Sequence, residues 1–107
     1  MFNFSIEIES IENYQNPANF LNFLSEEETE NKNLISLIGK VALKKAFFKC
    51  LGIKEDFKKI KIKKLTSGKP IIEIKDKTLK KILRNKKVSV SISHTKDIAV
   101  AICLIYE

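Results

Sequence analysis

Alternating apolar and polar residues predict strands along much of the chain. Residues 2–8 (FNFSIEI) place Phe or Ile at every second position, which is typical of a strand with one buried face. Residues 58–65 (KKIKIKKL) alternate Ile with Lys, and residues 70–74 (PIIEI) follow a TSGKP turn, so we expect a hairpin. Residues 88–93 (VSVSIS) alternate again, whereas residues 98–105 (IAVAICLI) are continuously apolar, which favours the centre of a sheet.

One long apolar segment predicts the main helix. Residues 33–52 (NLISLIGKVALKKAFFKCLG) are apolar around most of a helix circumference, so we expect this helix to be largely buried and to end at Gly52. Upstream, Ser25 and Glu28 have the spacing of a capping box, and Pro17 suits the first turn of a short helix. The sequence therefore predicts two helices between the first strand and the hairpin.

A shorter helical pattern precedes the last two strands. Residues 75–87 (KDKTLKKILRNKK) are amphipathic, and we expect three apolar residues to face inward: Leu79, Ile82 and Leu83. The predicted order of elements is β-α-α-β-β-α-β-β, with no internal repeat and no linker. This order and a length of 107 residues predict a single α+β domain spanning residues 1–107.

Charge is distributed unevenly along the chain, whose formal net charge is +7. Residues 1–39 hold one Lys against seven Glu, a net charge of −6. Residues 40–87 hold eighteen Lys or Arg against four acids, a net charge of +14, and residues 88–107 have a net charge of −1. A block this basic predicts a partner that carries phosphate, an acidic protein or nucleic acid, although a lysine-rich solubility surface gives the same pattern.

Other features narrow the class of protein. No apolar run approaches the roughly 20 residues that span a bilayer, and the N-terminus lacks the pattern of a signal peptide, so we expect a cytoplasmic protein without a membrane partner. Cys50 and Cys103 each lie in an apolar stretch, which predicts buried thiols in a reducing compartment. A disulfide or a metal pair is the alternative for the two cysteines.

Lysines recur at one-turn spacing in the main helix. Lys40 and Lys44 are four residues apart, and so are Lys45 and Lys49. Like charges at this spacing destabilise a helix by a few tenths of a kcal/mol unless an anion compensates. The pattern therefore indicates either a phosphate-binding cradle or lysine side chains whose ammonium groups extend to water.

Two polar turns offer further anion contacts. The TSGKP turn combines a glycine, a lysine and a rigid proline, and SISHT contains His94, the single histidine of the chain. Taken separately, each turn is a weak signal, because such residues more often have a structural role. The chain has no Walker loop, no CxxC pair and no HExxH motif.

Taken together, these segments resemble the holo-acyl carrier protein synthase family. The helix GKVALKKAFFKCLG is similar to that family's GRFAAKEAFxKAxG, and IKIKKLTSGKPIIEI is similar to its strand, SGKP turn and strand. The closing VSISHTKDIAVAICLIYE is similar to VSxSHTxDYAVAxVxxE. SIEIESIENY and FLSEEETE correspond to the first strand and the FTxxE helix start. The resemblance covers nearly the full length in the family's order.

The resemblance implies a fold, a reaction and partners. The fold is the small 4′-phosphopantetheinyl transferase-like α+β domain, in which an antiparallel sheet packs with one long and several shorter helices, usually as a trimer with shared active sites. The reaction transfers 4′-phosphopantetheine from coenzyme A to a serine of an acyl carrier protein and releases 3′,5′-ADP. In the family, Mg²⁺ bridges the pyrophosphate and is bound by an aspartate of the first strand and the glutamate of KEA.

The resemblance also suggests site residues. We expect coenzyme A to be bound by Lys40, Lys44, Lys45, Ser67, Gly68, Lys69, Pro70, His94 and Thr95. Three of them are candidates for catalysis: Lys44, Lys45 and His94. Ser10 replaces a family arginine that contacts the carrier, and Lys61 replaces an acid, so we expect the carrier to bind at Lys59, Lys61 and Lys63.

The family's metal ligands are not matched. An ungapped alignment places Phe4 at the aspartate and Lys45 at the glutamate, and neither side chain offers the hard oxygen ligand that Mg²⁺ prefers. We therefore expect no metal site built by the protein. Either Lys45 neutralises the pyrophosphate in place of the metal, or transfer activity has been lost and the chain is a module that binds coenzyme A or the carrier.

A nucleic-acid-binding domain is the remaining alternative, because the sequence is strongly basic. Such a domain needs aromatic side chains among its basic residues for base stacking. The lysine-rich residues 54–87 contain one aromatic residue, Phe57, so the sequence argues against nucleic acid as a partner.

Overall fold

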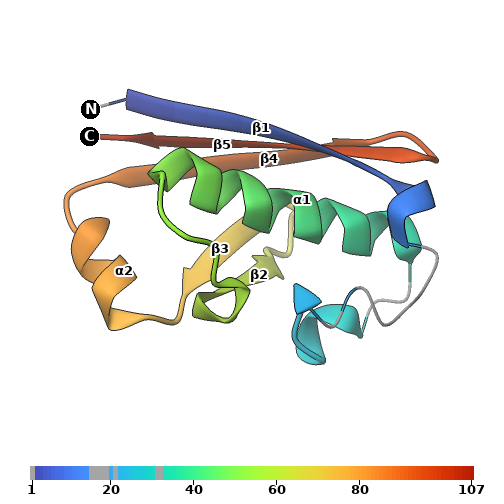
Figure 1. Ribbon diagram of the computed structural model, residues 1–107, viewed down its shortest axis with the longest axis horizontal. Coiled ribbons are helices and arrows are strands. Elements are labelled where there is room, and N and C mark those ends of the chain that lie inside the picture. The colour runs from blue at the N-terminus through green and yellow to red at the C-terminus, as the bar shows by residue number, and fades with distance from the viewer. Residues whose placement is uncertain (1, 15–19, 21, 31–32) are drawn as a thin grey trace.

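A long helix lies between two antiparallel sheets in the computed structural model (Figure 1). The structure describes residues 2–14, 20, 22–30 and 33–107. The helix expected to begin at Pro17 lies outside these residues. The α+β class is confirmed, and within the described part of the chain no helix is long and apolar enough to cross a membrane.

The larger sheet has three strands in the order β1-β5-β4, all antiparallel. Their bounds are β1 (Phe2–Ser10), β4 (Lys87–His94) and β5 (Ile98–Tyr106). The central position predicted for β5 is confirmed. Its inner residues are buried, but its outer face stays open, with Ile98 41% exposed and Ile102 38% exposed. The outer face of this sheet is therefore apolar and uncovered in the single chain.

The main helix α1 (Leu34–Leu51) packs against the inner face of this sheet. It begins at Asn33, whose side chain accepts a hydrogen bond from the Ile35 N–H, and it ends at Gly52 in the left-handed conformation, as predicted. Twelve of its 18 residues are buried, which confirms the prediction from its apolar circumference. A Cβ at Gly39 would lie 2.9 Å from Cγ2 of Ile92, so this glycine lets α1 approach β4 closely.

The predicted hairpin forms the second sheet, with strands β2 (Ile60–Lys64) and β3 (Pro70–Ile74). Ile60 and Ile62 of β2 enter the hydrophobic core together with residues of α1. The main core therefore lies between the helix and both sheets.

The short helix α2 (Lys77–Ile82) follows the hairpin. Leu79 is buried and Leu83 packs against the core, but Ile82 is 38% exposed, so its predicted inward orientation is wrong. Leu79 and Leu83 lie one turn apart and already cover the core, and Ile82 lies beside that face.

Short turns of 3-10 helix connect these elements in the described part of the chain, among them η1 (Ile11–Tyr14), η3 (Glu27–Thr29) and η4 (Phe57–Lys59). The capping box predicted at Ser25 is confirmed. The Ser25 N–H donates to Glu28 Oε1 at 2.9 Å, and the Glu28 N–H donates to Ser25 Oγ at 3.3 Å. The turn that it caps is η3, which is shorter than expected.

Candidate functional site

The lysines of α1 fall into two sets. Successive residues of a helix are about 100° apart, so neighbours in the sequence face different elements. One set reaches toward η3 and η4: Lys40 and Lys44. The other set reaches toward β1: Lys45 and Lys49.

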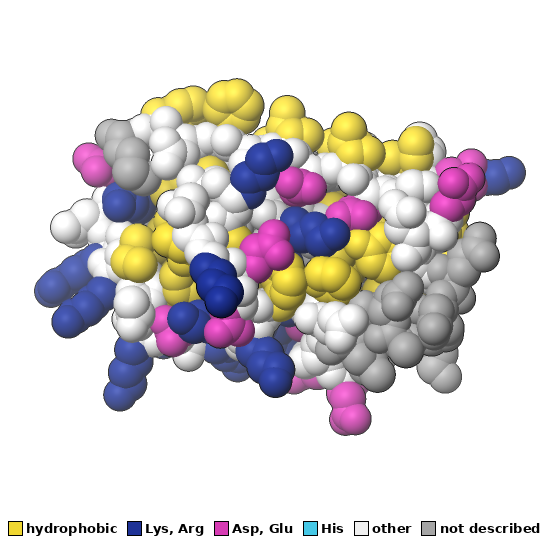
Figure 2. All heavy atoms as spheres, viewed as in Figure 1, with side chains coloured by type: hydrophobic (Ala, Val, Ile, Leu, Met, Phe, Trp, Pro, Cys, Tyr) yellow, Lys and Arg dark blue, Asp and Glu magenta, His cyan; other side chains and the backbone are white. Residues whose placement is uncertain are grey.

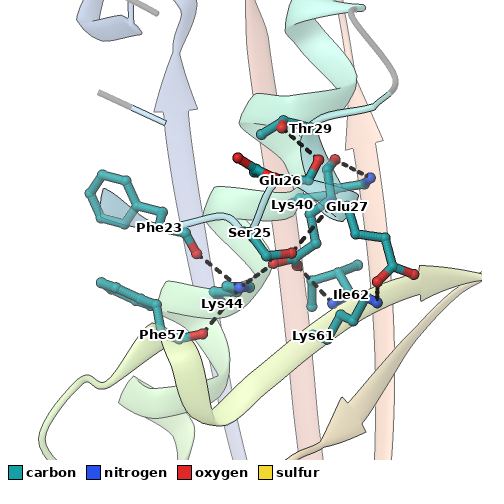
Figure 3. A network of polar contacts seen from close by, with 11 residues as sticks. Phe23, Ser25, Glu26, Glu27, Thr29, Lys40, Lys44, Phe57, Lys61 and Ile62 are labelled. Carbon is teal, nitrogen blue, oxygen red and sulfur yellow. Dashed lines mark hydrogen bonds and ion pairs between the residues drawn. The ribbon is translucent and has the colours of Figure 1, made fainter. Parts of the chain in front are cut away.

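Among the described residues, Lys44 is the most deeply buried cation, with its side chain 1% exposed. Its ammonium group donates to Glu28 Oε1 at 2.7 Å, to the Phe23 carbonyl at 2.8 Å and to the Phe57 carbonyl at 3.1 Å (Figure 3). Burial lowers the pKa of Lys44, and the hydrogen bond and charge of Glu28 offset this only in part. All three N–H donors are occupied, so the structure leaves none for the phosphate contact expected of Lys44.

Glu28 organises the rest of this network. Its carboxylate is 1% exposed and also accepts from the Ser25 and Ile62 N–H groups, each at 2.9 Å. Lys40 donates to the Glu28 carbonyl at 2.7 Å, and burial lowers the pKa of Lys40. Lys40 and Lys44 thus connect α1 to Glu28 of η3, and Glu28 in turn connects η3 to β2.

A pocket of about 720 Å³ opens over this network, within the range of small-molecule sites. The following residues line it: Asn22, Phe23, Leu24, Ser25, Glu26, Glu27, Glu28, Lys44, Phe57, Lys58, Ile60, Lys61 and Lys75. The Lys44 ammonium is already saturated, so cations available to a ligand here come from lysines other than Lys44.

Lys45 faces β1 and is only partly enclosed, with its side chain 24% exposed. Its ammonium donates to Glu9 Oε1 at 2.6 Å and to the Tyr14 hydroxyl at 3.3 Å, and it lies 4.9 Å from the centre of the Phe23 ring. Burial lowers the pKa of Lys45, but the hydrogen bonds to Glu9 and Tyr14 outweigh it and raise the pKa overall. The site therefore holds a positive charge in one place.

Glu9 supplies the carboxylate opposite Lys45, which corrects the ungapped alignment of the first strand. Side chains alternate across a strand, and Phe4 points to the outer face, where it is 62% exposed. Ser5 faces α1 but donates to the Ala46 carbonyl at 2.9 Å. The first strand therefore places a carboxylate, that of Glu9, against the helix, at a different position from the one that the ungapped alignment gave to the family aspartate.

A second ion pair continues this row. Lys49 lies one helical turn beyond Lys45, and its ammonium is 3.3 Å from Glu7, two residues before Glu9 on β1. Lys49 is 62% exposed and available to a ligand. The spacing of Lys49 from Lys45 had included it in the possible phosphate cradle, although it was not among the residues expected to bind coenzyme A. Nothing in the sequence indicated Tyr14.

A divalent metal does not fit this arrangement. Glu9 Oε1 accepts from Lys45, and Glu9 Oε2 accepts from the Tyr14 hydroxyl at 2.9 Å, so both carboxylate oxygens are already bonded. Among the described residues, no group of three or more Asp, Glu, His or Cys side chains is placed to hold a metal ion. The Mg²⁺ expected from the resemblance therefore has no protein ligand set at α1 and β1.

His94 ends β4 and is exposed. Its Nδ1 lies 3.1 Å from the Thr95 carbonyl oxygen. Because a carbonyl oxygen can only accept a hydrogen bond, Nδ1 carries the proton of this bond, and Nε2 takes no part in it. The Thr95 hydroxyl accepts the N–H groups of Asp97 and Ile98, each at 3.2 Å, and keeps its own proton for a ligand. The turn thus offers two polar groups in fixed positions.

The hairpin turn between β2 and β3 has a defined shape. The Leu65 N–H donates to the Lys69 carbonyl at 2.9 Å, and the Gly68 N–H donates to the Leu65 carbonyl at 2.8 Å. Gly68 has φ of 87°, a conformation that favours glycine. Ser67 and Lys69 are exposed, and Pro70 begins β3.

One chain does not bring His94 and Lys45 together. His94 is paired with Ala99 on β5, and Ala99 is paired with Glu9 on β1, so His94 and the partner of Lys45 lie on opposite edges of the sheet. Two strand spacings separate their backbones by about 10 Å. The β1 edge and the β4 edge therefore present separate halves of the predicted site.

Of the three lysines predicted to bind a carrier protein, Lys61 and Lys63 lie on β2 and Lys59 directly precedes it. Lys61 and Lys63 point from the same side of the strand and pair with Glu27 and Glu73, respectively. Lys59 ends η4 and is half-buried. Lys63 is the most open of the two paired lysines, with 45% of its side chain exposed against 13% for Lys61.

Comparison with known proteins gives a consistent picture. No protein-family model matches the chain. A curated holo-[acyl-carrier-protein] synthase of Caldicellulosiruptor saccharolyticus is 36% identical over an alignment 121 residues long, which covers 100% of this chain and 97% of that protein.

Solved structures agree in fold. The holo-[acyl-carrier-protein] synthase of Helicobacter pylori in complex with coenzyme A has a TM-score of 0.81 and 28% identity, covering 95% of this chain and 98% of that one. The Neisseria meningitidis synthase has a TM-score of 0.81 at 24% identity, covering 98% of both chains. At that lower identity the likeness shows the fold alone.

Proposed function

Because the chain belongs to the holo-[acyl-carrier-protein] synthase family, we propose that it transfers 4′-phosphopantetheine from coenzyme A to a serine of an apo-acyl carrier protein and releases 3′,5′-ADP. The observation that carries this proposal is the match to a curated synthase along the whole chain. The bound coenzyme A in the Helicobacter pylori relative supports coenzyme A as the donor substrate.

Phosphoryl-type transfer depends mainly on positioning and on neutralising charge. Beside the β1 edge, α1 supplies Lys45 and Lys49, which we assign to the pyrophosphate. The β4 edge supplies His94 and Thr95, which we also assign to a phosphate, with the Thr95 hydroxyl donating its proton to a phosphate oxygen. We assign the remaining phosphate contact to the turn formed by Ser67, Gly68, Lys69 and Pro70.

We propose a homotrimer in which each site is shared by two chains. The separation of Lys45 and His94 within one chain supports this arrangement, because neighbouring chains can join the two halves. The outer face of the large sheet supports it as well. Its exposed apolar side chains lie along the upper edge in Figure 2 and include Phe2, Phe4, Ile6, Ile8, Ile98 and Ile102. A surface of this kind favours association between chains.

We propose that the acidic carrier docks on Lys59, Lys61 and Lys63. Complementary charge accelerates encounter and makes it sensitive to salt. Reversing the three charges together should weaken carrier binding and flatten its salt dependence, measured by calorimetry at several ionic strengths. Unchanged affinity and salt dependence would remove these lysines from the carrier site.

The state of the two cysteines supports a cellular compartment for the protein. Cys50 and Cys103 are buried and free, which suits the reducing cytoplasm that the sequence predicts. We propose that the protein works there as one domain and supplies active carrier for fatty acid biosynthesis.

Incubation with coenzyme A and apo-carrier, followed by mass spectrometry of the carrier, tests the function. Transfer adds one phosphopantetheine group to the carrier. Lys45 in place of the family's glutamate favours a second candidate, a module that binds coenzyme A or the carrier without transfer. Binding detected by calorimetry without a gain in carrier mass would establish the second candidate instead.

A further inference from the structure

We infer that the Lys45 ammonium, held by Glu9, takes the place of a protein-bound divalent cation in this site, so that the chain needs no metal of its own. This inference rests on the proposed transfer reaction and deepens it. It starts from the disagreement between the metal expected by resemblance and the side chains that occupy its place.

The charges of the two arrangements agree. The resemblance implies one divalent cation between two carboxylates, a cluster without net charge. Here the Lys45 ammonium and the Glu9 carboxylate also form a cluster without net charge. Exchanging a glutamate for Lys45 changes the side-chain charge by as much as the divalent cation contributes, so the pyrophosphate meets the same overall charge.

Three contacts fix the position of the Lys45 ammonium. Glu9 and Tyr14 accept two of its N–H groups, and the Phe23 ring covers another side. Within the part of the chain that the structure describes, the third N–H has no acceptor, and about a quarter of the side chain is exposed. One donor on a fixed cation therefore remains for a phosphate oxygen.

The role in the reaction follows from where charge develops. The carrier serine oxygen forms a bond to the phosphorus of phosphopantetheine, the bond from that phosphorus to the bridging oxygen breaks, and the hydroxyl proton is released to solvent. The electron pair of the broken bond stays on 3′,5′-ADP. The negative charge therefore develops on the former bridging oxygen. A fixed ammonium beside the bridging oxygen stabilises this charge, as a metal or an arginine does in related reactions.

Cation dependence of the unmodified protein is the first test. After removal of metals, transfer to apo-carrier should proceed within about twofold of the same rate in EDTA and in Mg²⁺. Mn²⁺ titrated into the free protein should stay unbound, as judged by its electron paramagnetic resonance signal. Loss of transfer in EDTA with recovery in Mg²⁺, or one bound Mn²⁺ per chain, would overturn the inference.

A matched pair of variants sharpens the test. Lys45→Glu restores a carboxylate pair with Glu9 and should gain a Mn²⁺ signal and a requirement for Mg²⁺. Lys80→Glu makes the same charge change on exposed α2 and should behave as the unmodified protein in both assays. A Lys45→Glu protein that keeps full transfer in EDTA would show that Lys45 does not carry the metal's role.

Coenzyme A binding separates failure of this inference from failure of the function. Calorimetry should give the same affinity for coenzyme A in EDTA and in Mg²⁺, and Lys45→Gln should weaken it by about 10-fold or more. If transfer were absent under every condition, the proposed transferase function would be rejected. The coenzyme A affinities would still decide whether Lys45 takes the place of the metal. Affinity that needs Mg²⁺, or that ignores Lys45→Gln, would reject the inference by itself.

Discussion

Replacing Lys44 with methionine should lower the free energy of unfolding by about 3–5 kcal/mol, the usual cost of removing one partner of a buried ion pair. Methionine fills a similar volume, so the loss comes from polar groups. The Glu28 carboxylate, 1% exposed, would lose its cation, and the carbonyl oxygens of Phe23 and Phe57 would each lose a donor.

The neighbouring residue provides the comparison. Lys45→Met should cost less, about 1–2 kcal/mol, because Lys45 is partly exposed and Tyr14 still donates to Glu9. Lys80→Met, on the exposed side of α2, should stay within about 0.5 kcal/mol of the unmodified protein. The three lysines therefore rank by how many buried acceptors each one satisfies.

Urea denaturation followed by circular dichroism measures these differences. With the slope typical of a domain of this size, the Lys44→Met midpoint should fall by roughly 1.5–3 M. If Lys44→Met costs no more than Lys80→Met, the buried network does not hold Lys44, and its ammonium becomes available to a ligand. Equal losses for Lys44→Met and Lys45→Met would also refute the distinction between the two faces of α1.

Three further predictions concern other surfaces. His94→Ala should weaken coenzyme A binding with little change in the unfolding midpoint, because His94 is exposed; calorimetry and urea melts together check both effects. Phe4→Lys should convert the proposed trimer to smaller species in analytical ultracentrifugation, because Phe4 is 62% exposed on the apolar sheet face; an unchanged mass would exclude that face as the interface. Hydrogen bonds from Lys63 and Lys75 lower the pKa of Glu73 to about 2, so the stabilisation from its carboxylate is present above the usual glutamate pKa and lost as pH falls toward 2. An NMR titration of Glu73 should show this value, and Lys63→Ala should raise it.

The fold followed from short-range patterns that packing did not override. Alternation predicted β1, β2 and β4, and the continuous apolar run predicted the central strand β5. Gly52 ended α1 as expected, because a glycine in the left-handed conformation terminates a helix without a steric cost. The prediction for Ile82 was wrong because the apolar residues of the pattern cover a wider face of the helix than a six-residue helix buries.

The site followed less well, because a helix turns adjacent residues toward different neighbours. Lys44 and Lys45 read as equivalent in the sequence, yet one ammonium is enclosed by Glu28 and two carbonyls while the other keeps an open donor. The register of β1 posed the same difficulty. The ungapped alignment assigned Phe4 to the family aspartate, whereas the packing of α1 selects the opposite face of β1 and brings Glu9 to Lys45.

The uneven charge of the sequence has a similar explanation. Within the described part of the chain, four ion pairs join the acidic first third to the basic middle: Glu7–Lys49, Glu9–Lys45, Glu27–Lys61 and Glu28–Lys44. Part of what reads as a cationic block is therefore paired with acidic residues of the same chain. The charge available to coenzyme A depends on which of these pairs are exposed, and Lys45 and Lys49 meet that condition on α1. A basic stretch of sequence thus predicts a phosphate-binding surface only after its internal partners have been located.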